Sequence, residues 1–112
     1  MSQITTHILD TSKGRPAAGI TVVFYSGHGN NWEEIARGIS NQEGRVPDLL
    51  SWDQGLEFGN YKLRFETGAY FDQVKTSTFY PYIEIIFELK SNEHYHIPLL
   101  LNPFGYSTYR GT

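Results

Sequence analysis

Residues 20–25 read Ile-Thr-Val-Val-Phe-Tyr, and residues 83–88 read Ile-Glu-Ile-Ile-Phe-Glu. In each stretch every second residue is a large apolar one, the period at which a β-strand sends its side chains to the same face. The alternate positions hold Thr21, Val23 and Tyr25 in the first stretch and Glu84, Ile86 and Glu88 in the second. Such alternation suits a strand that covers a core on one face and is half-buried overall. Both stretches are therefore predicted to be half-buried antiparallel strands.

Short segments of similar composition recur along the whole chain. They are rich in Ile, Val, Thr, Tyr and Phe and are separated by turn residues; they cover residues 3–10, 19–26, 31–39, 59–66, 81–89, 94–101 and 105–110, with a further short strand at 44–48. Residues 68–75 differ, because Ala69, Phe71 and Val74 have the spacing of a short helix. The pattern predicts an all-β fold, a two-sheet β-sandwich of about eight strands with one short helix and Greek-key-like connections.

The length and charge of the chain indicate its number of domains and exclude some classes of binding partner. A chain of 112 residues, 39% hydrophobic and 19% charged, is predicted to fold as one domain spanning residues 1–112. The net charge of −3, with scattered basic residues, argues against nucleic acid and anionic membrane as partners. No segment is apolar for about 18 residues, so no membrane span is expected.

The composition also bears on the compartment. With no cysteine, the chain cannot form disulfides, which fits a reducing compartment. The first ten residues, MSQITTHILD, do not resemble a secretory signal. A cytoplasmic location is expected, with the peroxisome as the eukaryotic alternative.

Three of the four histidines fall in predicted strands. His94 and His96 are two residues apart, so a strand would point both imidazoles to one face and Tyr95 to the other. With His7 they could form a metal cage, or two imidazoles could activate a water molecule. They could also simply lie on the polar face of a sandwich. His28, in the glycine-rich stretch 26–31, is expected to be a loop residue.

The other polar residues carry weaker signals. Arg45 ends a turn-like run, Asn-Gln-Glu-Gly-Arg, and its planar guanidinium could offer paired donors to substrate oxygens. The acidic residues form no obvious acid–base pair and are expected on solvated strand faces, including Glu33, Glu34, Glu84 and Glu88. Nucleotide-binding and serine-nucleophile motifs are missing, so no cofactor is expected.

The last stretch, residues 94–112, reads His-Tyr-His-Ile-Pro-Leu-Leu-Leu-Asn-Pro-Phe-Gly-Tyr-Ser-Thr-Tyr-Arg-Gly-Thr. It resembles the C-terminal signature of the transthyretin-related 5-hydroxyisourate hydrolases, which typically includes His-Tyr-His-Val-Pro-Leu-Leu and ends in Tyr-Arg-Gly-Ser. Residues 6–17 and 41–45 resemble the first strand and a turn of the same family. The resemblance therefore spans the whole chain.

This resemblance implies a transthyretin-like β-sandwich that assembles as a homotetramer, a dimer of dimers, with active sites in the central channel. The family opens the six-membered ring of 5-hydroxyisourate by hydrolysis, giving 2-oxo-4-hydroxy-4-carboxy-5-ureidoimidazoline in urate breakdown. Carried over by position, the catalytic set falls on His7, Arg45, His96 and Thr112, while His94 and Tyr109 join Arg45 and Thr112 in binding the substrate. Thr112 replaces the usual serine; it keeps the hydroxyl and, as the last residue, an adjoining carboxylate.

The resemblance also suggests roles and a competing function. One histidine would act as general base and the other as proton donor or orienting partner, while Arg45 would clamp the substrate. Because a cationic Arg45 beside the histidines would oppose a dication, no metal is expected. The alternative is a transthyretin-like carrier without catalysis, but the carrier lacks counterparts of the histidine and arginine set.

Overall fold

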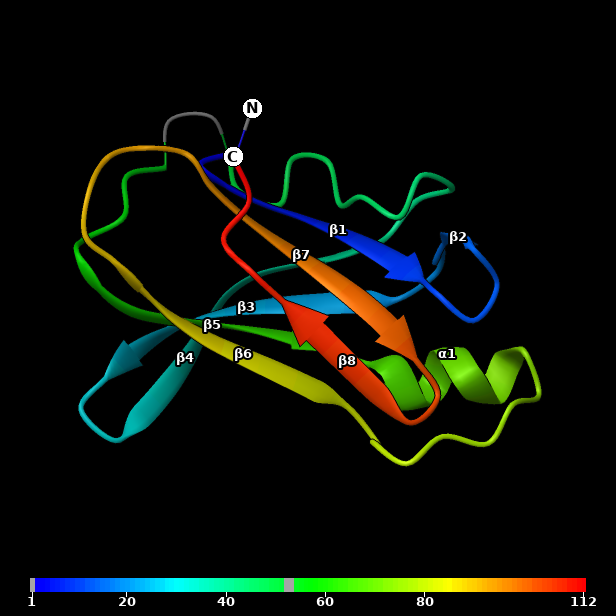
Figure 1. Ribbon diagram of the computed structural model, residues 1–112. Helices are drawn as coiled ribbons and strands as arrows, with labels where there is room; N and C mark the ends of the chain where they lie inside the picture. The colour runs from blue at the N-terminus through cyan, green and yellow to red at the C-terminus, as the bar shows by residue number, and fades with distance from the viewer. Residues whose placement is uncertain (1, 52–53) are drawn as a thin grey trace.

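Two four-stranded sheets pack face to face in the computed structural model, which describes residues 2–51 and 54–112 (Figure 1). One sheet has the strand order β2-β1-β7-β8 and the other the order β4-β3-β5-β6. In chain order the elements are β1 (Ile4–Asp10), β2 (Arg15–Pro16), β3 (Thr21–His28), β4 (Asn31–Ile39), β5 (Gly59–Phe65), α1 (Thr67–Gln73), β6 (Ile83–Leu89), β7 (Tyr95–Asn102) and β8 (Gly105–Thr108). The prediction of a two-sheet sandwich with eight strands and one helix is confirmed for these residues.

The strands β1 and β7 lie side by side and run parallel, although they come from opposite ends of the sequence. Their register pairs Ile4 with Tyr95, Thr5 with His96 and His7 with Pro98. Parallel neighbours need a crossover connection, and here the crossover contains the whole second sheet and the helix. The pairing places β1, which carries His7, beside β7, which carries His96 (Figure 1).

The core lies between the sheets. On β1, Ile4, Thr6, Ile8 and Asp10 are buried, whereas the residues between them are half-buried and face away from the core. Facing side chains from the second sheet and from β7 complete the core, among them Phe24, Leu63, Phe65, Leu99 and Leu101. Because strand side chains alternate, the outward face of β1 remains free for polar residues.

The predicted strands β3 and β6 both have antiparallel partners, as expected. Strict one-sided burial holds less well on β3, where Val23 is only 2% exposed although it alternates with the core residues. Its register partners in the sheet are Arg37 and Arg64, which are long enough to cover it with their aliphatic stems.

The helix falls one residue earlier and ends sooner than the predicted range of 68–75. It spans Thr67–Gln73 and buries Tyr70 and Phe71 against the core. Lys75 adopts φ 57°, in the left-handed region that a helix cannot continue through, so the chain turns away at this point.

Two predictions about individual segments are wrong. Residues 44–48 form no strand; Arg45 makes a single bridge to His7, because Gly44 and Asp48 have positive φ and Pro47 has no N–H to donate. The eighth strand is β2 instead. His28 is the last residue of β3, not a loop residue, because it pairs with Asn31 across a turn of only two residues.

Candidate active site

A hollow of about 520 Å³ opens on the side of the first sheet where β1 and β7 begin. Its walls come from the start of β1, the loop after β4, the start of β7 and the last residue of the chain. The lining residues are Thr5, Thr6, Asn41, Glu43, Arg45, Val46, Pro47, His94, His96 and Thr112. We call this hollow the histidine pocket.

Thr5 lies between the two histidines of the His-x-His stretch. Its Oγ1 is 2.7 Å from Nε2 of His94 and 2.8 Å from Nδ1 of His96. The two imidazole rings are nearly parallel, with an interplanar angle of 24° and centroids 6.2 Å apart. Tyr95 points the other way, into the core, where it is 7% exposed. The alternation predicted for this strand is confirmed, although His94 itself lies just before β7 begins.

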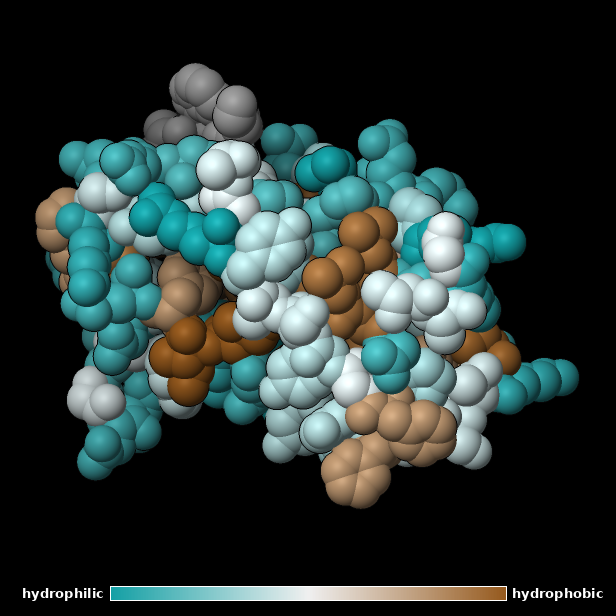
Figure 2. Space-filling view, viewed as in Figure 1, coloured by the Kyte–Doolittle hydropathy of each residue, from teal (hydrophilic) through white to brown (hydrophobic). Residues whose placement is uncertain are grey.

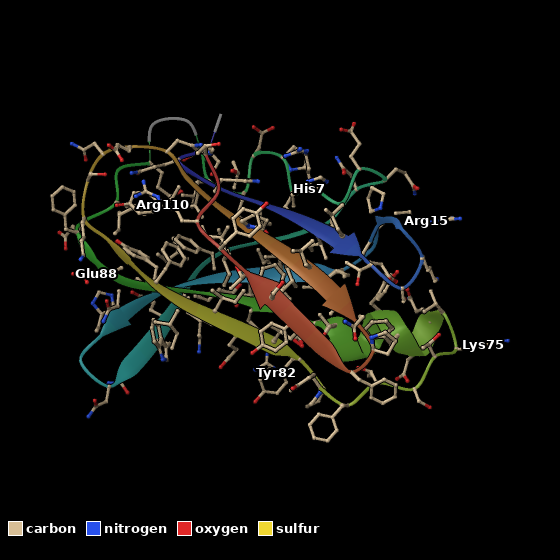
Figure 3. All side chains as sticks on the ribbon, viewed as in Figure 1. His7, Arg15, Lys75, Tyr82, Glu88 and Arg110 are labelled. Atoms are coloured by element: carbon tan, nitrogen blue, oxygen red, sulfur yellow. The ribbon has the colours of Figure 1, made fainter. Side chains whose placement is uncertain are left out.

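His7, labelled in Figure 3, lies on β1. It comes two residues after Thr5, so the alternation of the strand places both on the outward face. It does not line the histidine pocket directly, but its Nε2 is 2.8 Å from the backbone carbonyl oxygen of Glu43, a lining residue. A carbonyl oxygen only accepts hydrogen bonds, so Nε2 carries a proton and donates it. In the neutral ring, Nδ1 is then the nitrogen with a free lone pair.

A tight turn holds Arg45 at the edge of the histidine pocket. The side-chain Oδ1 of Asn41 accepts hydrogen bonds from the backbone N–H groups of Glu43, at 2.9 Å, and of Arg45, at 3.1 Å. Gly44 has φ +77°, and its carbonyl accepts a 2.8 Å bond from the N–H of Ile8 on β1. A Cβ at position 44 would collide with the carbonyl oxygen of Ile8, so glycine is required here.

The guanidinium of Arg45 has no hydrogen bond or salt bridge to any side chain between residues 2–51 or 54–112. Arg45 is exposed and lines the histidine pocket. Its five N–H donors are therefore available to a bound molecule with carbonyl or similar oxygens.

The surroundings of His96 favour its neutral form. Burial lowers the pKa of its imidazole below the ordinary value, and the positive charge of Arg45 and the neighbouring His94 and His7 lower that pKa further. An imidazole that is neutral at pH 7 can accept a proton from water. Because Nδ1 contacts Thr5, Nε2 is the nitrogen left for substrate or water.

The end of the chain packs along β7 and does not extend away from the fold. The N–H of Gly111 donates a 2.8 Å hydrogen bond to the carbonyl of His96, and Thr112 lines the histidine pocket. Tyr109, in contrast, is 59% exposed and lines a second hollow of about 480 Å³ between β6 and β8. Of the residues predicted for the site, the structure thus brings Arg45, His94, His96 and Thr112 into one pocket, with His7 beside it and Tyr109 apart from it.

Sequence reasoning missed Thr5 and Asn41. The alternation of β1 placed Thr5 on the face of His7, which was a usable signal, but its contact with His94 and His96 depends on the parallel pairing of β1 with β7. Asn41 acts through its side-chain oxygen, which stabilises the turn of Arg45.

Among the residues that the structure describes, the side chains suitable for metal binding do not gather into a metal site. Across residues 2–51 and 54–112, no three His, Cys, Asp or Glu residues are grouped so that they could hold an ion. Within the same residues, no helix has the length and apolar character to span a membrane.

Comparisons with known proteins agree with this fold. The model of the HIUase/Transthyretin family matches residues 4–111. A 5-hydroxyisourate hydrolase from Salmonella dublin is 43% identical over 110 residues, covering 97% of this chain and 80% of that protein. The chain therefore belongs to the HIUase/Transthyretin family.

Two of the similar solved structures are an enzyme and a thyroxine-binding transthyretin. The 5-hydroxyisourate hydrolase of Klebsiella pneumoniae superposes with a TM-score of 0.85 at 38% identity, covering 97% of this chain and 92% of that one. Sea bream transthyretin in complex with thyroxine superposes with a TM-score of 0.92 at 28% identity, covering 99% and 96%. Since the backbone fits both, the backbone alone does not separate enzyme from carrier.

Proposed function

We propose that this chain hydrolyses 5-hydroxyisourate in the histidine pocket. The prediction of a 5-hydroxyisourate hydrolase is confirmed by the names of its relatives, and they favour the enzyme over the carrier. The observation that carries the proposal is that His96 and Arg45 line one hollow, which is large enough for a small planar ring. Within residues 2–51 and 54–112 the guanidinium of Arg45 bonds to no side chain, and burial together with Arg45 lowers the pKa of His96.

The two histidines supply the acid–base chemistry. Each has one ring nitrogen committed to the protein: Nε2 of His7 to the Glu43 carbonyl and Nδ1 of His96 to Thr5. The opposite nitrogen of each ring is left for water or substrate. We assign the general base to Nε2 of His96, because burial and the nearby cation keep that ring neutral, and the orienting or proton-donating role to His7.

Arg45 and Thr112 complete the proposed site. The fork of Arg45 binds ring oxygens and stabilises the negative charge that develops on the attacked carbonyl. Thr112 lines the same pocket, and its hydroxyl would add a further hydrogen-bonding group. His94 lines the pocket and would face the substrate. Tyr109 lies outside the histidine pocket of its own chain, so its predicted contact with substrate would have to be made in the pocket of another copy of the chain.

A direct assay tests this function. Freshly generated 5-hydroxyisourate is followed by ultraviolet absorbance with and without the protein, with spontaneous decay as the baseline. We expect the wild-type chain to accelerate ring opening and a folded His96→Asn variant to lose that acceleration. A folded wild-type protein that leaves the decay rate unchanged, and that binds thyroxine with micromolar or tighter affinity, would make the chain a carrier.

The assembly proposed with this function is a homotetramer, a dimer of dimers. The strands β6 and β8 both end their sheets, and the second hollow lies between them, so the two open edges lie on the same side of the molecule. Figure 2 shows apolar side chains exposed over β6 and near the turn between β7 and β8, and Ile86 and Phe104 there are 59% and 69% exposed. Pairing of two copies along these edges would extend both sheets and cover such side chains.

Light scattering coupled to size exclusion measures this assembly. A mass four times that of one chain is expected, and a monomer that retains full activity would refute the tetramer. The single-domain organisation, the cytoplasmic location and the exclusion of nucleic acid stay predictions from composition.

A further inference from the structure

The hydroxyl of Thr5 contacts two imidazoles but carries only one proton. Its Oγ1 lies at hydrogen-bond distance from Nε2 of His94 and from Nδ1 of His96. A hydroxyl donates one hydrogen bond and can accept two. When the hydroxyl proton points to one ring, the other ring must supply the proton of the second bond.

This restriction links the tautomers of the two rings. If Thr5 donates to His94, then His96 carries its proton on Nδ1 and its Nε2 is free to accept a proton. If Thr5 donates to His96, then His94 carries a proton on Nε2, and a neutral His96 has its own proton on Nε2. The first arrangement makes His96 a base towards the histidine pocket, and the second makes it an acid.

The two rings also differ in their access to water. His94 is exposed, whereas His96 is half-buried and lies against Gly111. Thr5 therefore connects the half-buried imidazole of His96 to an exposed imidazole that solvent can reach.

We propose that Thr5 and His94 form a proton relay for His96, in which Thr5 is a positioning residue that passes protons between the pocket and solvent. This inference rests on the proposed hydrolysis. Opening a ring amide with water gives an N–H group and a carboxylic acid that ionises at pH 7, so each turnover releases one proton. His96 and its relay supply a route for that proton.

The relay carries one proton to solvent in four steps. Nε2 of His96 accepts a proton from the attacking water, whose oxygen bonds to the carbonyl carbon while the C=O π electrons move to the carbonyl oxygen as an oxyanion. The Nδ1–H bond of His96 then breaks as its proton moves to Oγ1 of Thr5. At the same time the original Thr5 O–H proton moves to Nε2 of His94. His94 is now an imidazolium and releases its Nδ1 proton to water, leaving His96 neutral with a proton on Nε2. The C–N bond of the intermediate then breaks, and the leaving nitrogen takes the proton of the intermediate's hydroxyl group, so the acid leaves as a carboxylate. Before the next turnover, Nε2 of His96 returns its proton to water while a proton from water enters through His94 and Thr5 to Nδ1 of His96, which restores the starting tautomers.

Other ionisable groups surround this relay and must be held constant in any test. On β1 the nearest is His7, and the turn after β4 contributes Glu43 and Arg45. Near the start of β7, Glu93 forms a 3.0 Å ion pair with Arg110. The five variants used below leave all of these groups in place.

Steady-state kinetics with chemical rescue tests the relay. The variants are Thr5→Val, which keeps the shape without the hydroxyl, Thr5→Ser, which keeps the hydroxyl, and His94→Ala, which leaves space for added imidazole. We expect Thr5→Val and His94→Ala each to lower kcat about 10-fold or more, the equivalent of one hydrogen bond, and Thr5→Ser to stay near wild type. Thr11→Val, on a threonine outside the histidine pocket, controls for the substitution itself.

Added imidazole separates a relay from a packing role. It should restore kcat to His94→Ala but not to the double variant Thr5→Val/His94→Ala, because the bridging hydroxyl is missing there. Equal rescue of the double variant would mean that imidazole acts directly in the pocket, and would overturn the relay. Unchanged kcat in His94→Ala, or equal losses in Thr5→Ser and Thr5→Val, would overturn it as well.

A spectroscopic measurement keeps this test independent of the reaction. Ring nitrogen chemical shifts from ¹⁵N-labelled histidine report which nitrogen of His96 carries the proton. In the wild type and in Thr5→Ser, the His96 tautomer should change over the pH range in which His94 titrates, and in Thr5→Val it should not. If the wild type showed this coupling but did not open the substrate, the proposed function would be wrong, while the hydrogen-bonded link from His94 through Thr5 to His96 would stand. A His96 tautomer that did not respond to His94 would refute that link.

Discussion

Gly111 lies directly against the imidazole of His96. Its N–H donates a 2.8 Å hydrogen bond to the His96 carbonyl, and a Cβ built on Gly111 would come within 2.6 Å of Cδ2 of that ring. Cδ2 is bonded to Nε2, the nitrogen left for substrate. The absence of a side chain at position 111 is therefore what allows the His96 ring to adopt its observed position.

Gly111→Ala should impair catalysis with little effect on folding. The added methyl group must push the His96 ring or the final strand segment aside, and misplacement of a reacting group by about 1 Å can cost on the order of 10²-fold in rate. The measurement is kcat/KM together with the thermal unfolding midpoint. Gly105→Ala is the matched control, since a Cβ there meets its nearest atom only at 3.7 Å. Wild-type activity in Gly111→Ala would show that the ring tolerates displacement.

His96→Asn and His7→Asn should each lower turnover by about 10²-fold or more, because general acid–base groups contribute factors of this size. Neither ring is part of the hydrophobic core, so the fold should persist, which circular dichroism and size exclusion verify. A folded variant that retained wild-type kcat would remove its histidine from the mechanism.

Arg45→Lys should lose most of the benefit of Arg45, although it keeps the charge. A lysine ammonium is a point charge and cannot form the paired, planar hydrogen bonds of a guanidinium. We expect kcat/KM to fall about 10-fold or more, consistent with losing one bond to a charged donor. An unchanged kcat/KM would contradict the clamp role and leave Arg45 with only an electrostatic one.

In a plot of kcat/KM against pH, the midpoint of the decline on the acid side should lie below the ordinary imidazole pKa of 6.5. Burial and then Arg45 lower the pKa of His96, so its neutral, active form persists as the pH falls, and kcat/KM declines only when the ring finally protonates. Removing the nearby charge with Arg45→Gln should raise this pKa, measured by NMR titration of the His96 ring. A midpoint in Arg45→Gln equal to or below that of the wild type would contradict this electrostatic coupling.

A buried polar pair, Asp10 and Tyr70, stabilises the fold away from the site. Asp10, at the end of β1, is 0% exposed and accepts a 2.6 Å hydrogen bond from the hydroxyl of Tyr70 on α1. Burial opposes ionisation of this carboxyl, but hydrogen bonds from Ser12 and Tyr70 outweigh it and hold the pKa of Asp10 below its ordinary value. Burial likewise raises the pKa of Tyr70, so the pair is a carboxylate with a neutral phenol.

Tyr70→Phe should lower the free energy of unfolding by about 1.5–3 kcal/mol near neutral pH, because a buried carboxylate loses a donor. Folding lowers the pKa of this carboxyl, so the carboxylate stabilises the native state at pH values above its pKa in the unfolded chain, near 3.8. That stabilisation is lost as the pH falls through the lower pKa of the native state. The difference between wild type and Tyr70→Phe should therefore shrink below about pH 3.8, as followed by urea unfolding at several pH values. Tyr106→Phe, at a tyrosine 42% exposed, is the control; a pH-independent difference would exclude the carboxylate as its cause.

Alternation along the chain determined much of the architecture and part of the site. Strand side chains repeat every two residues whatever the partner strand is, so the sequence predicted the core face of β3 and the shared face of His94 and His96. The resemblance of residues 94–112 to a known signature supplied the candidate residues, and the prediction of Arg45 within a turn required only local sequence. The helix was placed within two residues for the same reason, since its spacing is local.

Long-range pairing was decided only by the tertiary structure. Thr5 and His96 are 91 residues apart, and nothing in either segment specifies that β1 and β7 run parallel with these two residues opposite each other. That register follows from closing two sheets over one core, as do the contact of the Glu43 carbonyl with His7 and the placement of Tyr109 outside the histidine pocket. Local patterns determine which way a side chain points, but its neighbours depend on how distant strands share hydrogen bonds and burial.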